Sequence, residues 1–294
     1  MSSRHETERS VTDAEILKAA SAPGVLGASA YAAPVILATL YKPDVSAREV
    51  AQVIGQEPGM TASVLRVANS ALYGQSRVVG TIDRAVLLLG LDTVRGVAAA
   101  WCMRNTILPG NASSPLGVSA MLRHSVATAI AAHALARITR PAIAAEAFVA
   151  GLLHDLGVMV QLRLDPGGVL KLIDELRVDP ERGINELEQE RMGASHAHCA
   201  AVVFESWNLP AMLVSATGHH HDPGAAPVQN RELAALVNLG NHLSLTCDMG
   251  FPCEPMAGSR DASAADLLEL RDDQFERVAE TLPEQVTELQ NALA

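Results

Sequence analysis

The stretch Ala150–Gly157 constrains the fold of this chain more than any other feature of its sequence. It reads AGLLHDLG, so a His154-Asp155 pair stands among small and apolar residues. Imidazole and carboxylate groups are costly to bury without a partner, and both are good metal ligands. On a helix, adjacent side chains point about 100° apart and can hold one object from two sides. The alternative is that the pair hydrogen-bonds the backbone or itself within the core.

The composition favours closely packed helices. Hydrophobic residues make up 49% of the 294 residues and alanine is abundant, whereas aromatic residues make up only 3%. Alanine is the best helix former, while strands favour aromatic and β-branched residues. No alternating strand pattern and no repeat of fixed period is visible. We therefore expect an all-α protein, and its length allows one or two domains with a substantial core.

The charge distribution argues against direct nucleic-acid binding. The net charge is −11, and Glu254–Ala294 holds ten acidic and three basic residues, a net charge of −7. No basic patch is present and few aromatic residues are available for base stacking. The four cysteines form no CxxC pair, and we expect reduced thiols in a cytoplasmic protein without a signal peptide. No apolar run reaches transmembrane length without a charge or a turn signal.

Capping signals divide the first 110 residues into short helices. Thr12–Glu15 and Ser46–Glu49 each fit a capping box, in which two side chains satisfy free N–H groups at a helix start. Pro34 suits the first turn of another helix. Further helices are expected to start near Thr61, at Thr81 and after an Asp92 cap, and to end at Gly74 and Gly90. The segment Asn111–Gly117, NASSPLG, is the clearest linker and predicts a boundary between two subdomains.

The second subdomain is expected to hold longer helices. The pattern predicts a helix over 119–139, a helix that carries His154-Asp155, and helices over 169–176, 184–191, 196–207, 210–218 and 231–244. Ser195 is a candidate cap for the helix that begins at His196. Two amphipathic helices are predicted between Ser263 and Ala294. They are expected either to pack on the protein's own core or to support self-association.

The histidines concentrate in this second half. Nine of the ten lie between His124 and His242. Helices that bring together His124, the His154-Asp155 pair, His196 and the run His219–His221 would form a site for zinc, iron, manganese or nickel. A carboxylate between two metals can bridge them, and such a pair can activate water for attack on phosphorus. We expect His133 and His242 to be surface or internally satisfied residues, and His198 to point away from His196.

Several motifs together resemble the HDOD family, the HD-related output domains of bacterial signalling proteins. In the first subdomain the resemblance rests on Met60–Gly74, MTASVLRVANSALYG, and on Thr81–Gly90, TIDRAVLLLG. In the second it rests on Gly151–Gly157 and on three further motifs: Glu190-x-x-Gly193-x-x-His196, Trp207-x-Leu209-Pro210 and His220-His221-x-Pro223. It extends from about residue 25 to residue 245 and leaves out the acidic tail.

The resemblance implies a two-lobed, all-α HDOD fold whose second lobe is similar to HD-domain metal phosphohydrolases. The implied domains are an N-terminal extension (1–22), an N-terminal helical lobe (23–112), an HD-like lobe (113–250) and an acidic helical tail (251–294). Transferred by motif, the HD metal positions are His124, His154, Asp155, His196, His220 and His221. They imply one or two divalent transition-metal ions.

Three departures from the resemblance bear on activity. The closing Asp of the metal set falls at Asn241, and an amide is a poorer ligand than a carboxylate. HD phosphohydrolases often carry a phosphate-contacting Lys where this chain has Val158, and the GYP loop of cyclic-di-GMP phosphodiesterases is absent. We therefore expect a non-catalytic signalling module that acts on a regulatory protein partner. The alternative is a metal-dependent phosphohydrolase that acts on a nucleotide or cyclic dinucleotide.

Overall fold

The computed structural model describes residues 10–21, 32–42, 44–69, 78–104, 118–179, 184–252 and 260–293. In these ranges the chain forms helices joined by turns, without a β-strand, which confirms the all-α prediction. The predicted linker Asn111–Gly117, the terminator Gly74 and the thiol Cys253 lie outside the described residues.

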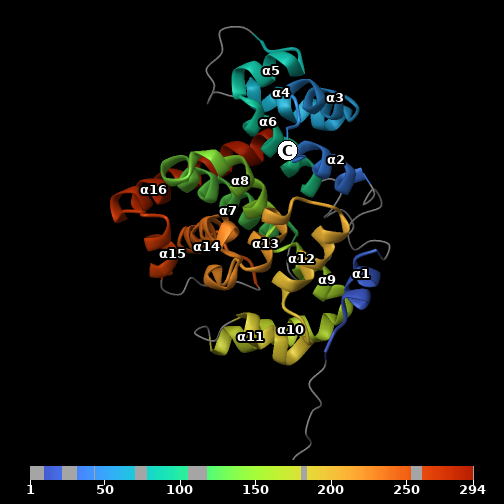
Figure 1. The fold of residues 1–294 in the computed structure, drawn as a ribbon, viewed down its shortest axis with the longest axis vertical. Coiled ribbons are helices and arrows are strands. Elements are labelled where there is room, and N and C mark those ends of the chain that lie inside the picture. Colours follow the sequence, from blue (N-terminus) through green and yellow to red (C-terminus); the bar gives the residue numbers. More distant parts are fainter. Residues whose placement is uncertain are drawn as a thin grey trace, which may run out of the picture.

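The first lobe is a cluster of five short helices. They are α2 (Ala32–Leu40), α3 (Ala47–Gly55), α4 (Pro58–Ala68), α5 (Ile82–Leu89) and α6 (Leu91–Cys102). Figure 1 shows them at one end of the molecule, in blue to green. Gly90 joins α5 to α6 with φ = +81°, a conformation that favours glycine, and the two helices meet at 117°.

The second lobe is built around one long helix, α7 (Val118–Thr139), which packs most extensively against α8 and α14. The other helices of this lobe are α8 (Ala144–Leu153), α9 (Leu156–Leu164), α10 (Pro166–Val178), α11 (Ile184–Met192), α12 (His196–Ser206), α13 (Ala211–Gly218) and α14 (Arg231–Thr246). The apolar segment Pro141–Leu164 is long enough to cross a membrane, but 83% of its most apolar window is buried inside the protein. It therefore serves as the centre of the core.

The two ends of the chain pack on the lobes. Helix α1 (Asp13–Ala20) contacts α9 and α12 of the second lobe. Two helices form at the other end, α15 (Ala262–Leu267) and α16 (Asp272–Leu293). The pattern placed the division between them after Leu282, which is wrong, since they divide at 268–271 and α16 continues through Pro283. Helix α16 contacts α7 as well as α4 and α6, so it lies where the two lobes meet (Figure 1). Its buried residues Val278, Leu282 and Val286 join the common core.

The predicted helix caps are largely confirmed. Thr12 and Ser46 each form the expected capping box, and Thr81 accepts a hydrogen bond from the backbone N–H of Arg84. Ser195 caps α12 in the same way, through the backbone N–H of His198. Because such caps involve residues two or three positions apart, they are visible in the sequence alone.

Three predicted helix starts are wrong. Helix α10 begins at Pro166 and not at 169, with Asp165 at the N-cap. Helix α4 begins at Pro58 and not near Thr61, since proline suits the first helical position, where its missing N–H costs nothing. Helix α6 begins at Leu91, with Gly90 at the N-cap. The expected cap Asp92 therefore lies in the first turn, where its carboxylate contacts Arg95 at 3.6 Å.

Candidate metal centre

The His154-Asp155 pair lies between two helices and not within one, which corrects the sequence prediction. Helix α8 ends at Leu153 and α9 begins at Leu156, so the pair forms a two-residue turn inside a continuous apolar segment. Asp155 leaves helical geometry, with φ = −94° and ψ = 8°. The turn interrupts the helix at this point, and both side chains are buried in the second lobe.

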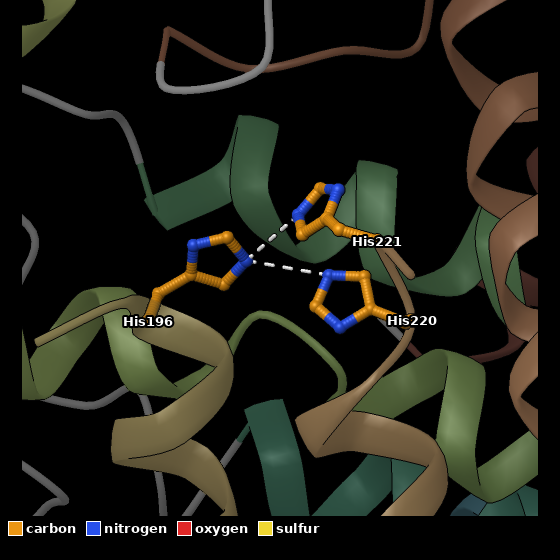
Figure 2. Close-up of side chains that lie close together, drawn as sticks. All are labelled: His196, His220 and His221. Atoms are coloured by element: carbon orange, nitrogen blue, oxygen red, sulfur yellow. Dashed lines mark hydrogen bonds between the residues drawn. The ribbon is translucent and has the colours of Figure 1, made fainter. Parts of the chain in front are cut away.

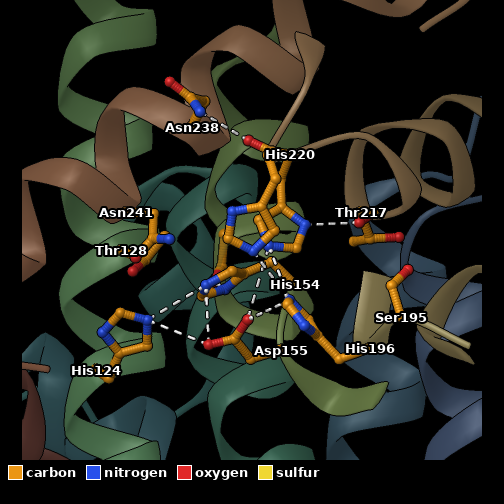
Figure 3. A network of polar contacts seen from close by, with 12 residues as sticks. His124, Thr128, His154, Asp155, Ser195, His196, Thr217, His220, Asn238 and Asn241 are labelled. Carbon is orange, nitrogen blue, oxygen red and sulfur yellow. Dashed lines mark hydrogen bonds and ion pairs between the residues drawn. The ribbon is translucent and has the colours of Figure 1, made fainter. Parts of the chain in front are cut away.

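Three other parts of the chain bring the remaining predicted ligands to this turn. His124 comes from α7, His196 is the first residue of α12, and His220 and His221 follow the end of α13. Figure 3 shows the side chains of His124, His154, His196 and His220 around that of Asp155. All six predicted metal positions thus lie in one cluster, although they span nearly a hundred residues of sequence.

The cluster consists of two groups of three ligands each. In the first group, the Nε2 atoms of His124 and His154 lie 3.3 Å apart, and each is 3.2 Å from Oδ2 of Asp155. In the second group, Nε2 of His196 lies 3.3 Å from Nε2 of His220 and 3.1 Å from Nε2 of His221 (Figure 2). In each group the candidate ligand atoms lie within 4.8 Å of one another.

Asp155 joins the two groups. Its Oδ2 faces the first group, while its Oδ1 lies 3.4 Å from Nε2 of His196 and 3.7 Å from Nε2 of His220. Neither oxygen accepts a well-formed hydrogen bond within the described residues, although both are fully buried. The carboxylate therefore stands where it could bridge two cations.

The other nitrogen of three of these rings is held by an acceptor. Nδ1 of His154 lies 2.7 Å from the carbonyl oxygen of Gly151, and Nδ1 of His220 lies 2.7 Å from that of Thr217. Since a carbonyl only accepts, both rings donate from Nδ1. Nδ1 of His196 lies 2.7 Å from the carboxylate of Glu188. In the neutral rings this leaves Nε2 with its lone pair directed into the cluster.

His124 is oriented by a chain of hydroxyl groups. Ser244 on α14 donates to the carbonyl oxygen of Asn241 at 2.9 Å and accepts from Thr128 at 3.3 Å. The Ser244 hydroxyl has a single proton, so its contact with Nδ1 of His124 at 2.9 Å is an acceptor contact. His124 therefore also donates from Nδ1 and presents the lone pair of Nε2 to Asp155.

Glu188 belongs to the candidate centre, and sequence reasoning missed it. It lies on α11, is 0% exposed, and accepts from both the backbone N–H and the ring of His196. A carboxylate behind a histidine fixes the tautomer of the ring and raises its basicity, an arrangement common around bound metals. The helix INELEQERM also carries Glu186 and Glu190, and nothing in this sequence identifies the buried glutamate.

The pKa values of two of the ligands, Asp155 and His220, are shifted toward the protonation state that binds metals. Burial alone would raise the pKa of the Asp155 carboxyl, but the neighbouring rings of His154, His124 and His196 hold it well below its ordinary value. Burial and the neighbouring rings of His221, His154 and His196 hold the pKa of His220 well below its ordinary value, although Asp155 opposes this. A carboxylate and neutral imidazoles are the protonation states that bind metals.

These residues fit a transition-metal centre. Lone pairs of neutral rings that face one another at 3.1–3.3 Å repel unless a cation or a shared proton lies between them. Imidazole with carboxylate is a donor set typical of zinc, iron, manganese and nickel sites. The first group would offer His124, His154 and Asp155 to one ion, and the second His196, His220 and His221 to another.

The centre is deeply buried. His124, His154, His196 and His220 are 0% exposed and Asp155 is 1% exposed. Phe251 covers one side, with its ring 5.2 Å from that of His124. Val158, at the position where the resemblance would place a lysine, is an apolar residue buried on α9. Of the six candidate ligands, only His221 is partly exposed.

The remaining histidines lie away from the cluster. His198 points away from His196, as predicted, and is exposed, where it contacts Asp13 of α1 at 3.1 Å. His219 turns back to the carbonyl oxygen of Ser215 at 2.8 Å. His133 and His242 are half-buried against Phe148 and Phe275. Among the run of three histidines, only His220 and His221 face the centre.

Asn241 lies on α14 beside the first group, next to Thr128 (Figure 3). It is 6% exposed, so an aspartate in its place would be a buried carboxylate. An amide adds no charge here. The first group therefore keeps a single carboxylate, Asp155, within the described residues.

Comparisons with known proteins agree with this architecture. The sequence profile of the HDOD domain family matches residues 29–223, about two thirds of the chain. A curated relative from Treponema pallidum (strain Nichols), named only as an uncharacterized protein, is 26% identical over 225 residues. That match covers 74% of this chain and 42% of the relative, so this chain spans less than half the length of the relative.

Three crystal structures share the fold. An HDOD domain protein of unknown function from Geobacter sulfurreducens is 23% identical, with a TM-score of 0.68 and coverage of 96% of this chain and 95% of its own. A proposed phosphohydrolase from Shewanella amazonensis SB2B is 23% identical, with a TM-score of 0.69 and coverage of 96% and 98%. A proposed signal transduction protein from Marinobacter aquaeolei VT8 is 22% identical, with a TM-score of 0.72 and coverage of 95% and 63%.

Proposed function

Because the chain belongs to the HDOD domain family, we propose that it is a non-catalytic regulatory module of cytoplasmic bacterial signalling. In this proposal the His/Asp centre holds one or two divalent transition-metal ions that serve structure or ligand sensing. The metal fixes the second lobe, and the first lobe and the lobe junction act on a regulatory protein partner.

The burial of the centre is the observation that carries the proposal. Five of the six candidate ligands are 0–1% exposed, and hydrolysis of a phosphodiester would require the scissile phosphate to reach them. Phosphoryl transfer also needs positive charge around the phosphoryl oxygens. Val158 offers none, and Asn241 supplies an amide where the family resemblance expects a carboxylate.

Exposed apolar residues support a partner surface on the first lobe. Leu87 on α5 is 86% exposed and Val78, which precedes that helix, is 83% exposed. The net charge of −11 supports a protein partner over a nucleic acid. We place the partner contact on this end of the molecule, where Leu87→Glu is expected to weaken binding without lowering the thermal stability.

A metal-dependent phosphohydrolase is the second candidate, and one observation favours it. Two groups of three ligands share the Asp155 carboxylate, the arrangement of a dinuclear site. When bound there, a pair of metals would supply activated water for attack on the phosphorus of a nucleotide or cyclic dinucleotide.

Metal content and turnover, measured on the same samples, separate the two candidates. We expect elemental mass spectrometry to find at least one transition-metal ion per chain in protein purified without chelators. His154→Ala is expected to lower both the metal content and the thermal stability, whereas the exposed-site control His198→Ala leaves both unchanged.

In the same samples we expect no hydrolysis of bis-p-nitrophenyl phosphate, cyclic dinucleotides or nucleotides. Metal-dependent turnover that disappears in His154→Ala would refute the non-catalytic proposal in favour of the hydrolase. Protein without any transition metal would refute the metal centre and leave the histidines as residues of the core.

A further inference from the structure

A second site lies at the junction of the two lobes, apart from the histidine centre. It is a cavity of about 430 Å³ with walls from α4 and α6 of the first lobe, α7 and α8 of the second lobe, and α16. Cavities of this size accommodate small organic molecules. Most of the wall is apolar and includes Val97, Ile130, Phe148 and Leu289.

One end of the cavity is polar. His133 and Arg137 lie one turn apart on α7, and both line the cavity. Arg137 forms no ion pair or hydrogen bond with any other residue in the described ranges. Burial and the nearby Arg137 lower the pKa of His133, so its ring is neutral near pH 7 and offers an N–H donor.

The acidic residues of the wall leave Arg137 available. Asp92 contacts Arg95 at 3.6 Å, so part of its charge is already balanced. Glu288 also lines the cavity, from α16, and it is not paired with Arg137, which forms no ion pair within the described residues. A ligand with an apolar body and one negative group would therefore place the body against Phe148 and Leu289 and the charge at Arg137.

We propose that this cavity binds a small organic anion with an aromatic or otherwise apolar body, such as an aromatic carboxylate or sulfonate. The ligand would contact both lobes and α16 at once and would stabilise the arrangement in which they are packed together.

The same two helices lead from this cavity to the histidine centre. On α7, Arg137 lies thirteen residues after His124, about 20 Å along the helix axis. On α8, Phe148 precedes His154 by six residues. Binding of a ligand in this cavity does not depend on the proposed function. The inference that such a ligand regulates the protein does rest on that function.

The probe for the test is 1-anilinonaphthalene-8-sulfonate, an aromatic anion whose fluorescence rises in apolar surroundings. We expect saturable binding of one molecule per folded chain. Ala134→Trp, which fills the cavity from α7, and Thr93→Leu, which fills it from α6, are each expected to weaken binding at least tenfold. Thermal unfolding of each variant shows whether it is folded, because this dye also binds partly unfolded protein.

The charge is tested separately. Arg137→Gln is expected to weaken probe binding about fivefold to tenfold, whereas Arg177→Gln, at an exposed arginine on α10 that contacts only Asp174, leaves it unchanged. Wild-type probe affinity in both filled variants would show that the probe does not bind in this cavity. Wild-type probe affinity in Arg137→Gln would show that the negative group of the ligand does not bind at Arg137. His154→Ala is expected to bind the probe normally, so failure of the metal centre would leave this result intact.

Discussion

At the residue scale, four of the five rings of the centre are held by a contact at Nδ1, on the side away from the cluster. His154, His220 and His196 are held at Nδ1 by a carbonyl or carboxylate, and His124 is held by the hydroxyl of Ser244. Glu188 is the only charged member of this outer set within the described residues, and it is completely buried. Its charge therefore has the largest effect on the basicity of the ligand that it supports.

Removal of that charge should weaken metal binding. Glu188→Gln keeps the size of the side chain but replaces the carboxylate that accepts from His196. We expect metal affinity to fall about tenfold to a hundredfold, as measured by competition with a chelating dye. Glu186→Gln, on the exposed side of the same helix, is the control and should bind metal like wild type. Equal affinity in both variants would contradict the role of Glu188.

The lowered pKa of His220 predicts a pH-dependent stability in metal-free protein. The unfolded ring takes up a proton near its ordinary pKa of about 6.5, while the buried ring does so only at much lower pH. Unfolding therefore binds a proton below pH 6.5, and stability falls as the pH drops. Between pH 7.5 and 5.5 we expect His220 to account for a loss of about 1 kcal/mol.

Urea unfolding in the presence of EDTA at the two pH values measures this loss. His220→Asn should reduce the pH dependence, and His198→Asn, at an exposed histidine, should leave it unchanged. An identical pH dependence in wild type and His220→Asn would show that His220 titrates in the folded protein as it does in the unfolded chain.

The sequence identified the candidate ligands better than their supports. His154 and Asp155 stand out because a polar pair in an apolar segment requires an explanation. His124, His196 and the run His219–His221 were candidates from the concentration of histidines, and the family resemblance narrowed the run to His220 and His221. Glu188 did not stand out, since it is one of three glutamates in a polar helix. Ser244 and Thr128 are common residues whose role depends on two helices, α14 and α7, that meet only in the folded chain.

At the element scale, glycines set how closely the helices around the centre approach. A Cβ atom at Gly157 on α9 would lie 1.8 Å from the carbonyl oxygen of His196 on α12. A Cβ atom at Gly240 on α14 would lie 2.9 Å from the carbonyl oxygen of Thr128 on α7. Both clashes are with backbone atoms, which cannot move without shifting a whole helix.

Gly157→Ala should therefore separate α9 from α12 and displace His196. We expect a loss of unfolding free energy of about 3 kcal/mol or more and weaker metal binding, measured by urea unfolding and by metal content. Gly55→Ala is the matched control, because nothing lies within 4 Å of its Cβ position. That change should alter stability by less than about 1 kcal/mol. Similar stabilities of the two variants would contradict the close packing.

Helix ends were predictable where the signal is local, and helix breaks were not. Thr12, Ser46, Thr81 and Ser195 cap their helices as expected, because a cap needs only the next few residues. The break at His154-Asp155 was missed. Pro141–Leu164 is mostly apolar around the pair, and no Gly or Pro beside the pair marks a break. The turn is accompanied by contacts with α7 and α12 that the local sequence does not contain.

At the scale of the whole molecule, α16 connects what the sequence suggested were separate parts. The acidic tail was predicted as two amphipathic helices, with packing on the core and self-association both open. In the structure α16 contacts α7 of the second lobe and α4 and α6 of the first, and Leu282 is 0% exposed. The described residues of both lobes and of α16 form one hydrophobic core, so we expect them to unfold together.

The two tryptophans report on this coupling, because Trp101 lies on α6 of the first lobe and Trp207 follows α12 of the second. Leu282→Ala should cost about 2–5 kcal/mol and lower the unfolding midpoint equally in single-tryptophan proteins made by Trp101→Phe or Trp207→Phe. Glu284→Ala, on the exposed side of α16, should change neither midpoint. If only one tryptophan responded to Leu282→Ala, α16 would stabilise one lobe alone. The cavity at the lobe junction would then lose its means of acting on both.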